Sequence, residues 1–291
     1  MNPNSRNYNT ISPSARALLL MKGLTEIPYA RQAAELMLYP DKYVPDYSSR
    51  EFGFWARVGH FENRYQSINQ LLEGLPITNI MELSSGFSFR GLHTVKNNDV
   101  FYIDTDLPDL ITTKTNFVTA LQQGDFETKG KLETLPLNAL DEEQFYERVS
   151  HFPPGEIVIV NEGLLMYLGM EEKEKLFELI RNVLKERGGY WITADVYIRN
   201  ANHNRALKMD DKLQQFFDEH RIEDNKFDSF EEAAAIFRKA GFEVDKEATP
   251  DYSKTTAMKY LLESADPGQL NAVGKAGKIH ATWRLKLVSG D

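Results

Sequence analysis

The feature that most constrains the fold is a regular alternation of strand-like and helix-like segments, which begins near residue 77. Short runs rich in β-branched and aromatic residues predict seven strands, at 77–83, 99–103, 131–137, 156–160, 190–196, 242–248 and 280–287. Helical patterns lie between most of them, and this order predicts an α/β fold with a mostly parallel sheet covered on both faces. No clear helical pattern separates the last two strands, which favours an antiparallel pair at one edge.

The segment before the first predicted strand has a different character. It contains three helical patterns, at 14–21, 30–38 and 52–72, and no strand signal. We therefore expect two parts: an N-terminal helical lid over residues 1–75 and an α/β domain over residues 76–291. A helical insertion is expected near 200–228, where the alternation is interrupted.

The net charge, the lack of cysteine and the short apolar runs limit which partners and which cellular location we expect. The net charge is −9 with a pI near 5.3, and such a surface repels phosphate backbones, so nucleic acid is not expected as a partner. The absence of cysteine excludes disulfides and a thiol nucleophile. Residues 1–10 lack the apolar core of a signal peptide, and no apolar run is long enough to span a membrane, so a cytoplasmic location is expected. These features give no prediction of the oligomeric state.

The first strand is followed by a turn of small residues. Glu82 lies in the strand, and Ser84, Ser85 and Gly86 follow it. Ligands of open α/β sheets bind beyond the carboxyl ends of the strands, so this turn is a candidate ligand contact. It lacks the Gly-x-Gly-x-x-Gly pattern that cradles a pyrophosphate, which favours a ligand without one. The alternative is an ordinary tight turn between strand and helix.

Two carboxylates end the second predicted strand. Asp106 lies 20 residues after Gly86, and Asp104 lies two residues before Asp106. A carboxylate at this position can accept hydrogen bonds from two ribose hydroxyls. We expect the two side chains to project to opposite sides, so that only one reaches the ribose. The alternative is that both are helix-capping or solvated acids.

A glutamate directly follows the fourth strand. Glu162 is expected to face the same cleft, where it would bind a ligand or organise a substrate. The alternative is a carboxylate whose charge is stabilised by nearby helix N-termini. The apolar run 164–168 is expected to be core, with Tyr167 either in the core or in a substrate pocket.

Four ordered segments together resemble the leucine carboxyl methyltransferase family, including its bacterial polyketide-type O-methyltransferases. Asp104 and the run Asp106-Leu107-Pro108, with Lys114, resemble the family's acidic-x-Asp-Leu-Pro-x5-Lys signature. Segment 82–90 resembles its Gly-Ala-Gly-x-Asp-Thr-Arg turn, segment 138–141 its Asp-Leu-Arg-Asp motif, and segment 161–168 its Ala-Glu-Gly-x-Leu-x-Tyr-Leu motif. The resemblance covers residues 15–200 and implies a Rossmann-like class I methyltransferase that uses S-adenosylmethionine.

The resemblance also implies a role for each matching position. The turn Ser84–Gly86 would pack on the methionine part of the cofactor, Asp106 or alternatively Asp104 would hold the ribose, and Glu162 would lie beside the cofactor. Asn138 and Ala139 would lie at the adenine. A basic residue from the N-terminal helices would pair with the cofactor carboxylate. The candidates, in order of preference, are Arg57, Arg64 and Lys22.

The chain departs from the family pattern at three of these positions. Ser84 stands where the family has a glycine, and Ser88 and Asn138 stand where it has aspartates. The side chain of Ser84 adds a Cβ where the cofactor should approach closely. The three differences motivate a second reading, in which the chain binds the cofactor without turnover.

The sequence leaves the methyl acceptor open. The resemblance implies a small molecule with a hydroxyl or a carboxylate, or a protein C-terminal carboxylate. A hydroxyl acceptor needs a general base, for which His60 and Tyr167 are the first candidates, followed by His93 and His151. The six histidines lack the spacing of metal ligands, so no metal is expected.

A nicotinamide-dependent oxidoreductase is the main alternative on a similar sheet. Such an enzyme would need a glycine fingerprint for the pyrophosphate and usually a Tyr-x-x-x-Lys pair. The sequence contains neither pattern.

Overall fold

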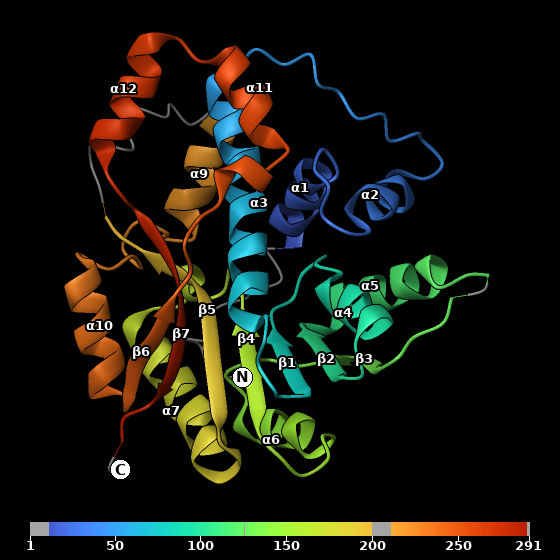
Figure 1. Cartoon of the computed structure of the whole chain (residues 1–291), viewed down its shortest axis with the longest axis vertical. Helices are drawn as coiled ribbons and strands as arrows, with labels where there is room; N and C mark the ends of the chain where they lie inside the picture. Colours follow the sequence, from blue (N-terminus) through green and yellow to red (C-terminus); the bar gives the residue numbers. More distant parts are fainter. Residues whose placement is uncertain (1–11, 125, 200–210, 290–291) are drawn as a thin grey trace.

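A computed structural model describes residues 12–124, 126–199 and 211–289 of the chain. Its centre is a single seven-stranded sheet with the strand order β3-β2-β1-β4-β5-β7-β6 (Figure 1). The strands are β1 (Asn79–Leu83), β2 (Phe101–Asp106), β3 (Lys131–Pro136), β4 (Ile157–Asn161), β5 (Gly189–Tyr197), β6 (Phe242–Glu247) and β7 (His280–Leu287). All seven predicted strands are present; β7 has the predicted bounds, and the bounds of the other six are shifted by one to three residues.

The sheet is parallel except for one strand. β1 pairs in parallel with β2 and β4, whereas β7 runs antiparallel to both β5 and β6. The predicted antiparallel pair at one edge is therefore confirmed. The expectation of no helix between these strands is wrong, because α11 (Ala257–Ser264) and α12 (Pro267–Ala276) lie between them. The Pro, Gly and Asp residues around these two short helices hide their periodicity in the sequence.

Helices cover both faces of the sheet. Besides α11 and α12, the described helices are α1 (Ser12–Lys22), α2 (Ala30–Leu38), α3 (Phe52–Leu72), α4 (Arg90–Asn97), α5 (Pro108–Leu121), α6 (Glu142–Ser150), η2 (Leu165–Tyr167), α7 (Met170–Arg187), α9 (Asp211–Glu219), α10 (Phe230–Lys239) and η3 (Tyr252–Lys254). Alternate side chains of each strand enter different cores. Met81 and Ile159 pack with α6, α7 and α10, while Ile80 and Val158 pack with α4 and the end of α3.

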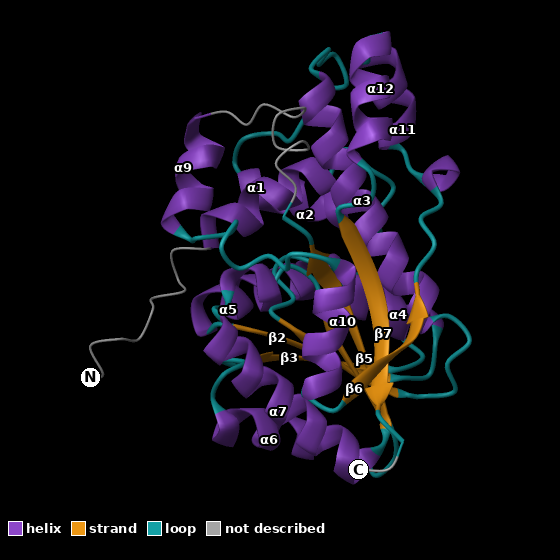
Figure 2. Cartoon of the chain, turned by 90° about the vertical axis from the view of Figure 1, so that its left-hand side faces the viewer, coloured by secondary structure: helices purple, strands orange, loops and turns teal. Residues whose placement is uncertain are grey.

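A second group of helices lies beyond one end of the sheet. Figure 2 shows α1, α2, α9, α11 and α12 gathered there with the first half of α3, away from α6 and α7. Two distant segments meet in this group, because the Trp55 ring of α3 stacks on Tyr260 of α11 at a centroid distance of 4.5 Å. The buried residues of α3 near its other end, such as Ile68 and Leu71, pack on the sheet. We call α1, α2, α9, α11, α12 and the first half of α3 the cap; α3 therefore connects the cap to the sheet.

Two boundary differences bear on the site. Strand β2 begins and ends later than the predicted 99–103; it contains Asp104 and ends at Asp106, so both aspartates lie at its carboxyl end. The expected helical insertion near 200–228 contains α9, while its residues 200–210 lie outside the described part of the chain. Within the described residues, no helix is both long enough and apolar enough to cross a membrane.

Candidate functional site

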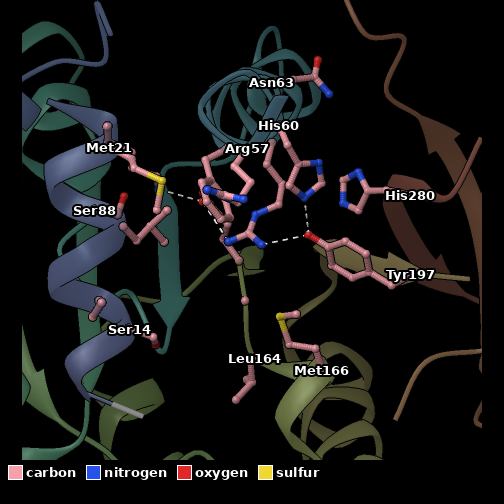
Figure 3. Close-up of a pocket in the computed structure, with 18 of the residues that line it drawn as sticks. Ser14, Met21, Arg57, His60, Asn63, Ser88, Leu164, Met166, Tyr197 and His280 are labelled. Carbon is pink, nitrogen blue, oxygen red and sulfur yellow. Dashed lines mark hydrogen bonds and ion pairs between the residues drawn. The ribbon is translucent and has the colours of Figure 1, made fainter. Parts of the chain in front are cut away.

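A cavity of about 1930 Å³ lies between the cap helices and the sheet. Its floor is made by the ends of four strands: Ser84 follows β1, Asp106 ends β2, Glu162 follows β4 and Tyr197 ends β5. Because carboxyl ends of parallel strands meet at one edge, four short sequence segments supply one surface. Figure 3 shows side chains from α1, α3 and the strand ends pointing toward this space.

The turn after β1 has an unusual backbone. Ser84 has φ +49° and Gly86 has φ +51°, so both residues lie in the left-handed region. Glycine adopts this region without cost, whereas a residue with a Cβ does not. A Cβ added to Gly86 would meet no atom within 4 Å, which means that the turn borders open space. Ser84 is one of the positions where the chain differs from the family pattern. Its positive φ is a physical reason why a glycine would suit this position.

We expect the Ser84→Gly variant to be more stable than the wild type by about 1 kcal/mol, because it removes a left-handed residue with a Cβ. Thermal unfolding of the full chain measures this difference. Gly86→Ala is the opposite control, since it adds a Cβ at a similar φ without a steric clash. A lower melting temperature for Ser84→Gly would contradict the argument.

The two aspartates of β2 differ in depth. Asp104 is fully buried, and its Oδ2 lies 2.9 Å from Nζ of Lys114. Asp106 is 8% exposed and lines the cavity, and its two carboxylate oxygens accept hydrogen bonds from the backbone N–H groups of Gly86 (2.8 Å) and Leu107 (2.7 Å). Burial raises the pKa of Asp106, and those two donors and Lys114 oppose the effect.

The expectation that the aspartates project to opposite sides is wrong. Residues two apart in a strand share a face, and the same Lys114 acts on both carboxylates. Burial raises the pKa of Asp104 to about 6, with Lys114 opposing the shift. Only Asp106 lines the cavity, as preferred from the sequence. The reason is that Asp106 lies nearer the end of the strand than Asp104 on the same face.

Glu162 is the centre of a buried charge cluster. Its Oε1 lies 2.7 Å from Nζ of Lys22 and 3.2 Å from Nη2 of Arg64, and its Oε2 accepts from Nη2 of Arg90 at 2.8 Å. Burial alone would raise the pKa of Glu162, but the three cations hold it well below its usual range. The four residues come from α1, α3, α4 and the turn after β4, so the cluster connects the cap to the sheet.

The cluster carries more positive than negative charge. Glu82 joins it through Nε of Arg90 at 3.6 Å, which gives three cations and two carboxylates. Burial lowers the pKa of Lys22, and attraction to Glu162 offsets part of that shift. An anionic group that enters the cavity beside Lys22 and Arg64 would balance this excess.

Two of the sequence candidates, Glu82 and Asp104, lie outside the cavity lining, whereas Arg57 belongs to it. Glu82 is fully buried, accepts from the Tyr102 hydroxyl at 2.5 Å and, like Asp104, is not among the described residues that line the cavity. Arg57 lines the cavity and forms no ion pair with the described part of the chain. Among Arg57, Arg64 and Lys22, Arg57 is therefore the cation whose charge is not paired with a carboxylate of the described residues.

Asn138 and Ala139 line another part of the cavity wall, after β3. The Asn138 Oδ1 accepts from the backbone N–H of Leu140 at 3.1 Å, so the side chain holds the turn that it belongs to. Ala139 is 7% exposed, and its neighbour Leu137 is also buried. Leu137, Ala139 and Leu140 make this corner of the cavity mostly apolar.

His60 and Tyr167 both line the cavity, whereas His93 and His151 do not occur among its described lining residues. His60 lies on α3, with its Nε2 2.8 Å from the Tyr197 hydroxyl. Of the aromatic residues in 29–55, only Phe52 is among the described lining residues, and Trp55 is fully buried against Tyr47 and Tyr260. The described residues contain no group of three or more His, Cys, Asp or Glu that could hold a metal ion.

Several residues of the site were not predicted. Asp195 of β5 accepts from the backbone N–H groups of Gly163 (2.6 Å), Leu164 (2.7 Å) and Leu165 (3.0 Å), and so it shapes the turn that carries Glu162. A carboxylate inside the apolar run of β5 was the available signal. Tyr197 and His280 gave no comparable signal, because their roles depend on the pairing of β5 with β7.

No protein-family model matches the chain, and a comparison with curated proteins gives no match either. Among solved structures it is similar to a DUF574 family protein from Streptomyces avermitilis, at 12% identity over 94% of this chain and 97% of that chain with a TM-score of 0.52. It is also similar to magnesium protoporphyrin IX methyltransferase from Synechocystis (8% identity, 80% and 86% coverage, TM-score 0.48) and to an O-methyltransferase family protein from Burkholderia thailandensis (14%, 99% and 75%, 0.44). The first similarity confirms the predicted fold class, a Rossmann-like α/β fold with a mostly parallel seven-stranded sheet.

Proposed function

We propose that the chain is an S-adenosylmethionine-dependent O-methyltransferase that acts on a small molecule, and that it belongs to the leucine carboxyl methyltransferase family. The observation that carries this proposal is the position of Asp106. Its carboxylate ends β2 at the cavity wall, next to an open turn and near a buried cluster with excess positive charge.

The residues present fit such a cofactor. Each Asp106 oxygen accepts one backbone N–H and keeps a lone pair for a ribose hydroxyl. The open space at Gly86 accommodates the methionine part, with Ser84 and Ser85 on the same turn. Asn138 and Ala139 would border the adenine. Asp104 is the less suitable ribose partner, because it is fully buried against Lys114.

The charges suit the two charged groups at the amino-acid end. A carboxylate would be attracted by Lys22 and Arg64, with Arg57 as a further cation at the cavity wall. Glu162 would face the ammonium group. The cofactor supplies an electrophilic methyl group, and the protein aligns the acceptor and excludes water.

The lid is the second part of the proposal. Lys22 lies at the end of α1, and Arg57 and Arg64 lie on α3, so residues 1–75 would cover a cofactor held by residues 76–291. The residues at positions 84, 88 and 138 also allow the alternative that the chain binds the cofactor without turnover. A test for methyl transfer to an acceptor distinguishes an active enzyme from such a protein.

Calorimetric titration of the full chain tests the proposal. We expect binding of S-adenosylmethionine and S-adenosylhomocysteine, and no binding of NAD. Asp106→Asn should weaken both affinities by about 30-fold or more, because it weakens charge-assisted hydrogen bonds to the ribose. Asp99→Asn is the matched control, since Asp99 is exposed and lies outside the cavity lining. Absence of heat with both sulfur compounds would refute the proposed function.

A further inference from the structure

The cavity is larger than a single cofactor needs. Sites for one drug-sized ligand usually measure roughly 300–1000 Å³, and this cavity measures about 1930 Å³. Around His60 and Tyr197 the wall carries apolar side chains of α3, η2, α11 and the segment before β7. Among them are Phe61, Met166, Met258, Leu261 and Ile279. The total volume and this apolar lining suit a second, mainly apolar molecule beside the cofactor.

Three polar rings meet in this part of the cavity. Nε2 of His60 lies 2.8 Å from Oη of Tyr197, and the ring of His280 lies 5.1 Å from the His60 ring and 4.6 Å from the Tyr197 ring. They come from α3, β5 and β7, and Figure 3 shows them facing one another, with dashed lines from the Tyr197 oxygen to His60 and to a guanidinium nitrogen. Three separate elements thus place one hydroxyl at the cavity wall.

The hydrogen-bond directions favour a neutral pair. Arg64 donates from Nη1 to the Tyr197 oxygen at 2.9 Å, since a guanidinium has no acceptor. The tyrosine proton can then point to Nε2 of His60. His280 donates from Nε2 to the carbonyl of Ala194 at 2.8 Å, and burial lowers its pKa to about 4, so it adds no charge beside His60 at neutral pH.

Arg64 contacts both Glu162 and Tyr197. One of its terminal nitrogens contacts Glu162 at 3.2 Å and the other contacts Tyr197 at 2.9 Å. The Tyr197 hydroxyl therefore lies one guanidinium group away from the residue assigned to the amino-acid end of the cofactor. A cofactor whose amino-acid end is held beside Glu162 would bring its sulfonium into the same part of the cavity, where an oxygen bound at Tyr197 could accept the methyl group.

We propose that Tyr197 and His60 bind the oxygen of an apolar hydroxylated acceptor and remove its proton during methyl transfer, an inference that rests on the proposed function. The acceptor oxygen forms a bond to the methyl carbon as the carbon–sulfur bond breaks, and that electron pair stays on sulfur. The acceptor proton passes to Oη of Tyr197 while the tyrosine proton passes to Nε2 of His60, which becomes an imidazolium. A carboxylate acceptor has no proton to lose at neutral pH and would not need the pair.

Matched probes test the assignment with labelled cofactor and the full chain. 2-Naphthol carries a hydroxyl on a flat apolar body, and 2-naphthoic acid carries a carboxylate on the same body. We expect methylation of 2-naphthol. His60→Ala and Tyr197→Phe should each lower kcat by about 100-fold or more, with the affinity for S-adenosylhomocysteine within about 2-fold of wild type. Added imidazole should restore part of the kcat of His60→Ala, which a structural role would not allow.

His93→Ala is the control, because His93 lies on α4 outside the described lining of the cavity. His60→Gln replaces His60→Ala if the smaller side chain prevents folding. Methylation of 2-naphthoic acid alone, undiminished kcat in both variants, or cofactor binding without transfer to either probe would overturn this inference and leave the cofactor assignment standing. Loss of binding in the wild type would instead refute the proposed function.

Discussion

The Glu162→Gln variant is expected to lose about 3–5 kcal/mol of the free energy of unfolding, because the substitution removes the counter-charge of three buried cations. Lys22, Arg64 and Arg90 all contact this carboxylate within 3.2 Å, and all are buried. Glutamine preserves the shape of the side chain but turns an amide N–H₂ toward at least one cation. Denaturant unfolding of both proteins measures the loss.

The pH dependence of this loss has a defined sign. The pKa of Glu162 is held well below its usual range, so its contribution is fully present above the pKa of an unfolded glutamate and disappears only in strong acid. The difference between wild type and variant should therefore be constant from about pH 5 to pH 8. Glu147→Gln is the matched control, since its partner Arg148 lies 2.7 Å away on the surface, where such pairs contribute little. Equal losses in the two variants would contradict the role of Glu162.

The second large effect is expected for Asp195→Asn, with a loss of about 3 kcal/mol or more. The Asp195 carboxylate accepts three backbone N–H groups of the turn after β4 and the Asn161 amide at 2.6 Å. An asparagine has one acceptor atom and presents donors to the rest, which leaves buried N–H groups unsatisfied. Chemical denaturation measures the stability, and cofactor titration measures the accompanying displacement of Glu162.

The control for Asp195 is Asp141→Asn at the start of α6. Asp141 accepts from the backbone N–H of Gln144 at 3.0 Å, and asparagine is an equally good helix cap. That variant should therefore change the free energy of unfolding by only a few tenths of a kcal/mol. A comparably small effect for Asp195→Asn would mean that water replaces the missing acceptor.

The sheet could be predicted because its strands carry their own signal. β4 is a continuous β-branched run, buried on both faces, and helices α2 and α3 begin and end where the sequence patterns do. The helices between β6 and β7 could not be predicted in the same way. α11 buries only Ala257 among its residues, so its periodicity is weak, and it is held by packing on α3.

The same distinction applies to the site. Ser84 and Glu162 follow strand ends and Asp106 ends a strand, and the geometry of parallel sheets brings such positions together without further information. Arg90 and Tyr197 depend on packing between segments that are far apart in the sequence: Arg90 contacts Glu162 across 72 positions, and Tyr197 contacts His60 across 137. Glu82 and Asp104 are buried below the cavity wall, although the sequence indicated them as cofactor contacts. The strand pattern does not reveal how deep a residue lies.

The ion pair between Lys22 and Glu162 would couple a movement of α1 to the electrostatic potential inside the cavity. The ammonium group of Lys22 belongs to α1, yet it is one of the three cations around Glu162. If α1 moves away from the sheet, the cavity opens and its wall loses one positive charge in the same step. A movement of α1 would therefore change both the access to the cavity and the electrostatic potential that a ligand meets inside it.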